Sequence, residues 1–155
     1  MEEEFHNHMR IPWHDYTRKS IGRPITEASL SEKASIIGRT GIMLLSCGTG
    51  AWRVRSSMNT LARELGITCT ADIGLLSIEY TCIDGGNCYT ESLCLFNTGV
   101  NTSKLYRMEL FVNKFSKNCK KMSGDELHTL LDQIHEIHGF YSPPFLGLAA
   151  AVACS

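Results

Sequence analysis

The stretch RTGIMLLSCGTGAWRVRSSMNTLARELG, residues 39–66, joins two apolar-periodic runs through a corner that contains two glycines. The first run begins behind a capping box at residues 29–32 and repeats apolar or small residues at Leu30, Ala34, Ile37, Gly41, Leu44 and Gly48. The second run repeats Val54, Met58, Leu61 and Leu65 and closes on Gly66, a residue typical of a left-handed helix cap. The stretch therefore predicts an amphipathic helix ending near Gly48, a tight corner and a second helix.

Three short segments follow that are rich in β-branched and aromatic residues: ITCTADIG, LLSIEYTCIDG and NCYTESLCLF. A two-residue turn at Gly85 and Gly86 would make the last two a hairpin with Ile83 opposite Cys88. One face then carries Leu76, Ile78, Tyr80, Cys82, Tyr89, Leu93 and Leu95, and the other carries Ser77, Glu79, Thr81, Thr90 and Ser92. This alternation predicts a sheet with one buried face and one mostly polar face.

Two more helical patterns close the domain. Thr102 or Ser103 is expected to cap a run with Leu105, Met108, Val112 and Phe115. A second capping box, residues 123–126, opens a run with Leu127, Leu130, Leu131, Ile134 and Ile137 that Gly139 and Pro143 end. The predicted order is ααβββαα, an α+β fold with helices on one face of a small antiparallel three-stranded sheet. Residues 29–140 form this domain, and residues 1–28, which lack a period, are expected to be a flexible arm.

Composition bounds the class of protein. A chain of 155 residues is long enough to bury one hydrophobic core without the help of disulfides or metal ions. The net charge of −1 offers no basic field, so a nucleic-acid partner is not expected. Seven cysteines is an odd number, and the start MEEEFHNHMR does not resemble a secretory signal, so reduced thiols in the cytosol are expected.

The C-terminal segment is apolar. After YSPP, the residues FLGLAAAVACS (145–155) carry no charge, whereas a membrane-spanning helix needs about 20 apolar residues. Taken alone, the segment is an apolar tail. Taken as part of a longer protein, residues 141–155 are the beginning of a first transmembrane helix.

Gly48, Gly50 and Arg53 at the corner are the candidate binding residues. A dinucleotide fingerprint is not matched, because a third glycine is missing and the glycines follow a helix. A carboxylate could instead bind the amides at the start of the second helix, with Arg53 beside it. The alternative is a purely structural corner whose arginines face water.

Other chemistry-bearing residues have weaker patterns. His128, Asp132 and His135 share one helical stripe, which suits a metal site or an acid–base pair but is more typical of a solvated polar face. Cys82, Cys88 and Cys94 project from opposite sheet faces and are expected to be small apolar fillers, and the pair His6 and His8 to be solvated. No cofactor, metal site or catalytic residue is predicted.

The chain from about residue 31 to its end resembles the N-terminal part of the threonine/serine exporter family. The resemblance is carried by the corner stretch, a β segment with a DGG turn, SKLYRMELFVNKFS, SGDEL and PPFLGLAAAVACS. The most specific part is the order Gly41, Leu44-Leu45, Gly48, Gly50, Arg53-Val54, Met58, Leu61-Ala62, Leu65-Gly66. One departure is Arg55, because the family commonly has an acidic residue directly after the Arg-Val pair.

The resemblance implies a cytoplasmic domain at the plasma membrane that precedes a transmembrane bundle in the same or a partner chain. It also implies export of threonine, serine or related small organic acids, with a gating, sensing or assembly role for the domain rather than an enzymatic one. Two alternatives stay open. One is a soluble hydrolase-like enzyme that uses His128, Asp132 and His135, and the other is a small-ligand-binding module at the corner.

Overall fold

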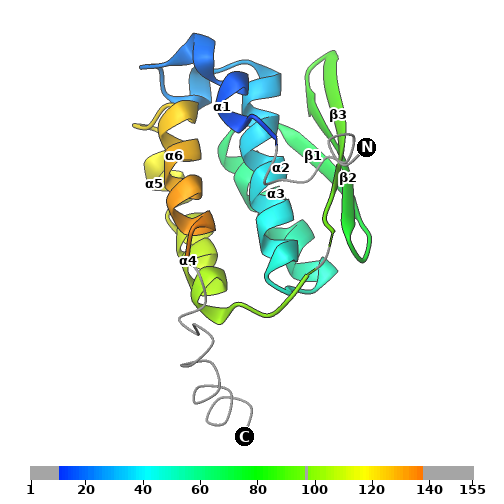
Figure 1. Cartoon of the computed structure of the whole chain (residues 1–155). Helices are drawn as coiled ribbons and strands as arrows, with labels where there is room; N and C mark the ends of the chain where they lie inside the picture. The colour runs from blue at the N-terminus through cyan, green and yellow to red at the C-terminus, as the bar shows by residue number, and fades with distance from the viewer. Residues whose placement is uncertain (1–10, 97, 138–155) are drawn as a thin grey trace, which may run out of the picture.

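Helix α2 (Leu30–Ser46) is the central element of the fold. The computed structural model describes residues 11–96 and 98–137, and in it α2 lies between the sheet and the helices α4 (Thr102–Asn113) and α6 (Gly124–His135) (Figure 1). Every residue from Glu32 to Leu45 is buried. The prediction of an amphipathic helix is therefore wrong for α2, because a helix enclosed on all sides has no solvent face to keep polar.

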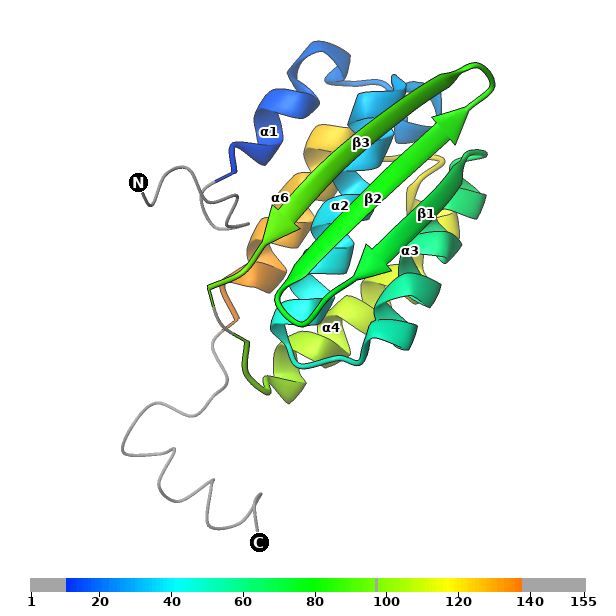
Figure 2. The ribbon, with the colours of Figure 1, turned by 90° about the vertical axis from the view of Figure 1, so that its right-hand side faces the viewer.

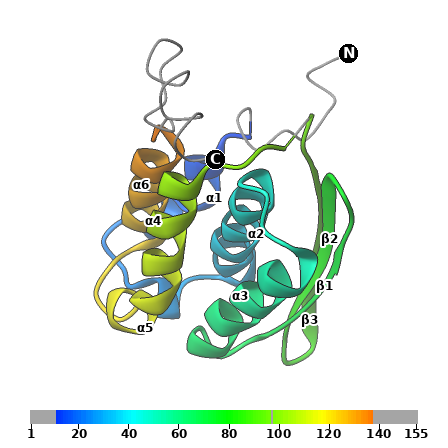
Figure 3. The same cartoon turned by 90° about the horizontal axis from the view of Figure 1, so that it is seen from below.

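The remaining elements follow the predicted order with short additions. Helix α3 (Ala51–Glu64) precedes the strands β1 (Thr68–Ile73), β2 (Ser77–Asp84) and β3 (Asn87–Cys94), and the short helix α5 (Phe115–Asn118) follows α4. The sheet is antiparallel in the order β1-β2-β3, and the helices cover one of its faces (Figures 2 and 3). The α+β class and the ααβββαα core are confirmed.

Local capping signals fix the helix starts. In α2 and α6, Ser29 and Ser123 accept from the backbone amides of Glu32 and Glu126, whose carboxylates accept from the two serine amides. The expected cap of α4 at Thr102 or Ser103 is wrong by one or two residues. Asn101 holds that place: its backbone is extended, and its side chain accepts from the amide of Lys104 at 3.0 Å.

The hairpin has the predicted register. Ile83 pairs with Cys88, and Ile78, Tyr80, Cys82 and Leu93 point into the core. We expect Ile78→Ala to lower the free energy of unfolding by about 2–5 kcal/mol, because it leaves a cavity beneath the sheet. Thr81→Ala on the opposite face is expected to cost under about 1 kcal/mol, since the side-chain hydrogen bond between Thr81 and Thr90 is exposed. Urea unfolding of both variants measures the difference, and equal costs would contradict the register.

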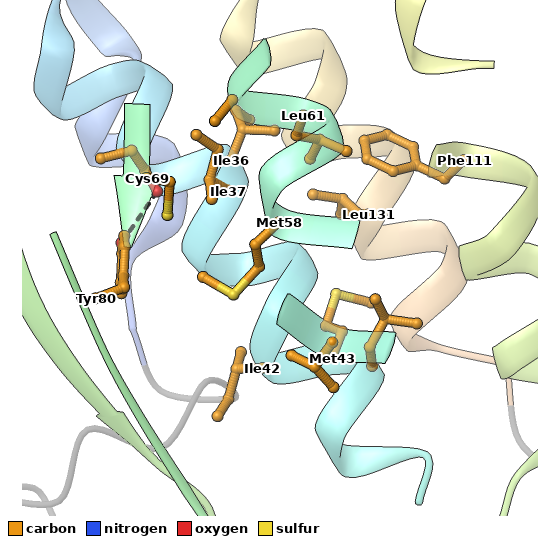
Figure 4. Close-up of a cluster of buried hydrophobic side chains, with 14 of the residues drawn as sticks. Ile36, Ile37, Ile42, Met43, Met58, Leu61, Cys69, Tyr80, Phe111 and Leu131 are labelled. Carbon is orange, nitrogen blue, oxygen red and sulfur yellow. Dashed lines mark hydrogen bonds between the residues drawn. The ribbon is translucent and has the colours of Figure 1, made fainter. Parts of the chain in front are cut away.

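The core lies between α2 and its neighbours. Figure 4 shows Ile36, Ile37 and Met43 of α2 among side chains of α3, β2, α4 and α6, which include Met58, Leu61, Tyr80, Phe111 and Leu131. The Tyr80 hydroxyl donates to the carbonyl of Ala34 at 3.0 Å, so the one large polar side chain in this cluster is satisfied.

The expectation of a flexible arm is wrong for residues 11–28. They form helix α1 (Trp13–Tyr16) and the two 3-10 turns η2 (Arg18–Ser20) and η3 (Ile25–Glu27). Trp13 and Ile25 are buried in the core, and the amide of Ile25 donates to the carbonyl of Met122 at 2.9 Å. The sequence shows no period here because three-residue turns are too short to display one. His6 and His8 lie outside the described residues.

None of the helices within residues 11–96 and 98–137 is both long and apolar enough to cross a bilayer. The segment expected to begin a transmembrane helix, residues 141–155, lies outside the described residues.

Candidate functional site

The predicted corner residues lie where α2 meets α3. Gly48 has a φ of +89°, and a Cβ there would lie 3.3 Å from the carbonyl oxygen of Gly99, so the corner requires glycine at this position. Gly50 is different: its φ is −67°, and a Cβ would meet nothing within 4 Å. Arg53 donates to the Glu109 carboxylate at 2.7 Å and so links α3 to α4. A ligand at this corner stays a prediction.

A different group of side chains forms the most developed polar site. We call it the polar cluster, and it connects α1, α2 and α6 through His14, Ser35, Arg39, Asp125, His128 and Asp132. Two of the predicted residues, His128 and Asp132, belong to it. His128 is fully buried, so the expectation of a solvated polar face is wrong for this residue.

Arg39 is the buried cation of the polar cluster. Its side chain is only 4% exposed, and its Nη2 donates to Asp132 Oδ1 at 2.5 Å. Its Nη1 donates to the carbonyl of His128 at 3.2 Å, and its guanidinium lies 5.7 Å from the centre of the Trp13 ring. Burial lowers the pKa of Arg39, and the Asp132 carboxylate opposes that change. The carboxylate is therefore the counter-charge on which a buried guanidinium depends.

His14 bridges two carboxylates. Its Nδ1 lies 2.6 Å from Asp125 and its Nε2 lies 2.7 Å from Asp132, so in the protonated ring both nitrogens donate to a carboxylate. Burial lowers the pKa of His14, but the two carboxylates outweigh burial and the net pKa is raised. The stabilisation from this bridge is therefore complete below the ordinary histidine pKa and is lost as the pH rises through the raised value.

The sequence also matches a family model. The model of the ThrE family, described as "Putative threonine/serine exporter", matches residues 35–155. The chain belongs to the threonine/serine exporter family. No curated protein and no solved structure matches it significantly. The matched region includes Arg39, His128 and Asp132 as well as the corner, whereas His14 lies before it.

The hydrogen bonds of His128 define its tautomer in this member of the exporter family. Ser35 donates its hydroxyl hydrogen to the carbonyl of Glu32 at 2.7 Å, so its oxygen accepts from His128 Nε2 at 2.9 Å. Nδ1 then accepts from Arg39 at 3.2 Å, and the ring is neutral. Burial and the charge of Arg39 lower the pKa of His128 to about 3.

A shallow hollow of about 230 Å³ opens beside the polar cluster. Its lining includes Trp13, His14, Arg39, Asp132 and His135. Burial, together with Lys104 and Arg39, lowers the pKa of His135. In the described part of the chain, no group of three or more His, Cys, Asp or Glu side chains is arranged to hold a metal ion. Cys82 is buried on one sheet face, whereas the partners of Cys88 and Cys94 place these two on the other.

Sequence reasoning missed four of the six residues of the polar cluster: His14, Ser35, Arg39 and Asp125. Ser35 and Arg39 lie in the apolar run of α2, where two polar residues on one side of a buried helix were the available signal. His14 gave none, because it sits on a four-residue helix more than 100 positions from its partners.

The buried neutral state of His128 predicts an acid-sensitive fold. Its pKa is lowered, so its stabilisation is complete above the ordinary pKa of about 6.5 and is lost as the pH falls toward the folded value. We expect the urea midpoint of the wild-type chain to fall between pH 6.5 and pH 4.5. His128→Gln, whose amide can donate to Ser35 and accept from Arg39, should flatten this fall. An identical fall in both proteins would assign the effect to other groups, of which His135 is the first.

Proposed function

We propose that this chain supplies the cytoplasmic domain of a membrane exporter of threonine, serine or related small organic acids, and that the domain gates transport. The proposal rests first on the family match over residues 35–155. The partner is then the transmembrane domain of the same or a partner chain, which the apolar segment 145–155 would begin. The proposed cellular location is the plasma membrane, with this domain on the cytoplasmic side.

The observation that carries the gating role is the connection of the polar cluster to α6. Three of the six cluster residues, Asp125, His128 and Asp132, lie on this helix. The helix ends at His135, and residues 136–140 alone separate it from the segment expected to enter the membrane. In this proposal a shift of α6 against α2 is transmitted to that segment, and the ion pair between buried Arg39 and half-buried Asp132 opposes such a shift.

Sensing of a small amino acid at the corner is a second role for the same domain. Gly48, Gly50 and Arg53 would take its carboxylate. Arg53 already holds the Glu109 carboxylate, so a ligand would have to compete with that pair. We therefore propose the polar cluster, and not the corner, as the main functional site.

The polar cluster argues against the hydrolase alternative. In a serine hydrolase, one ring nitrogen of a histidine accepts the proton of the serine hydroxyl. The other ring nitrogen of that histidine donates to a carboxylate. Here Nε2 donates to Ser35, and a cation donates to Nδ1. Ser35 and His128 are also fully buried, so a substrate has no access to them.

The test is an efflux assay with the whole exporter. Cells preloaded with labelled threonine or serine are compared for initial efflux at equal membrane abundance. We expect His14→Gln to change the efflux rate, because it frees α1 from Asp125 and Asp132 while leaving the pair of Arg39 and Asp132 in place.

Lys19→Gln is the matched control, since it removes one positive charge from an exposed position of the same segment. We expect it to leave efflux unchanged. Wild-type efflux from the His14 variant and from a chain without residues 31–140 would refute a gating role.

A further inference from the structure

Exposed apolar side chains gather at one end of the domain. The described residues include seven large hydrophobic side chains that are exposed, and two of them, Ile21 and Ile83, lie elsewhere. Three of the other five, Trp52, Leu75 and Val100, define what we call the corner end. The exposed fractions of Trp52, Leu75 and Val100 are 74%, 85% and 82%, so these three project furthest into solvent.

Three separate chain segments converge to form the corner end. Trp52 is in the first turn of α3, and Leu75 is in the turn between β1 and β2, where Arg55 of α3 donates to the carbonyl of Ala71 at 3.2 Å. Val100 precedes α4, and the neighbouring Gly99 donates its amide to the carbonyl of Ser46 at 3.3 Å. Figures 2 and 3 show the start of α3, the β1–β2 turn and the start of α4 at this common end.

The described chain also ends here. The side-chain amide of Asn101, at the start of α4, donates to the carbonyl of Ile137 at 3.3 Å. The lower ends of α4 and α6 in Figure 1 are accordingly neighbours. The apolar residues 145–155 begin eight positions after Ile137 in the sequence.

We propose that the corner end inserts Trp52, Leu75 and Val100 into the headgroup boundary of a phospholipid bilayer. This inference rests on the proposed membrane location. Tryptophan and tyrosine favour the membrane–water interface, and leucine and valine gain free energy by leaving water. Arg55 lies near the start of α3 and Lys104 near the start of α4, and their charges suit lipid phosphates.

The layout favours lipid over a protein partner. The central part of a protein interface is depleted of charge and lines a continuous surface. At the corner end, the three apolar side chains lie on separate segments, and Arg55 and Lys104 follow Trp52 and Val100 closely in the sequence. The hollow beside Trp52, about 280 Å³, is lined by polar residues and two arginines, Arg55 and Arg63. Such a surface matches a mixed layer of headgroups and acyl chains.

Quenching of tryptophan fluorescence tests the contact. The 155-residue chain has two tryptophans, and Trp13 is only 3% exposed, so brominated acyl chains should quench Trp52 alone. The chain is mixed with phosphatidylcholine vesicles and with vesicles that contain phosphatidylglycerol. We expect quenching in both, stronger with the anionic lipid, and its loss in Trp52→Phe.

Leu75→Ser combined with Val100→Ser should lower the Trp52 quenching by roughly tenfold, because it removes two apolar groups from the lipid contact. Ile21→Ser combined with Ile83→Ser is the matched control and should leave quenching unchanged. A chain that sediments with vesicles but keeps unquenched Trp52 would overturn the inference and leave the proposed membrane location intact. Shielding of Trp52 from both lipid bromine and aqueous acrylamide in the whole exporter would assign the corner end to a protein contact instead.

Discussion

Asp132→Asn is expected to lower the free energy of unfolding by about 3–5 kcal/mol, because it leaves the Arg39 guanidinium buried without its counter-charge. The Arg39 side chain is 4% exposed, and its remaining acceptors, the carbonyl and Nδ1 of His128, are neutral. Urea unfolding at pH 7 measures the loss. A loss of this size is a large fraction of the stability of a small domain.

Two further variants isolate the cause. Asp125→Asn removes only one contact of His14, which keeps Asp132, so it should cost about 1 kcal/mol. Adding Arg39→Met to Asp132→Asn removes the buried charge and should restore part of the lost stability. Equal losses for Asp125→Asn and Asp132→Asn, with no recovery in the double variant, would show that the charge of Arg39 does not control the result.

Gly38→Ala is expected to lower the free energy of unfolding by about 3 kcal/mol, although alanine normally stabilises a helix interior by about 1 kcal/mol over glycine. A Cβ on Gly38 would lie 2.2 Å from Tyr80 Oη and 2.4 Å from its Cζ. Tyr80 cannot yield, because its ring is 1% exposed and its hydroxyl donates to the carbonyl of Ala34. Thermal or urea unfolding measures the change.

Gly50→Ser is the control for Gly38→Ala, because a Cβ at position 50 meets no neighbouring atom within 4 Å. Position 50 caps α3 and has open space around it, and serine is a better helix cap than glycine, so stability should be unchanged or slightly higher. The expectation that the corner needs glycine therefore applies to Gly48 and not to Gly50. Adding Tyr80→Phe to Gly38→Ala should recover only part of the loss, since the ring carbon stays too close. A stabilised Gly38→Ala variant would contradict the packing of α2 against β2.

The local features of this domain could be predicted from sequence because their partners are neighbours in the chain. The capping boxes at Ser29 and Ser123 join residues three positions apart, and the hairpin register follows from the turn at Gly85. The cap at Gly66 and the positive φ of Gly48 depend equally on local backbone geometry. The motifs at the corner and in the later segments carried the family resemblance that the match over residues 35–155 confirms.

The tertiary structure alone decided which faces are buried and which distant side chains meet. The sequence of α2 shows an apolar period, but only packing between the sheet and α6 buries its polar residues as well. His14 meets Asp132 across 118 positions, and Arg39 meets it across 93. Such a pairing has no sequence period, because tertiary packing alone brings these distant charged side chains together. The sequence by itself determined the elements and their order, and the fold determined the polar cluster.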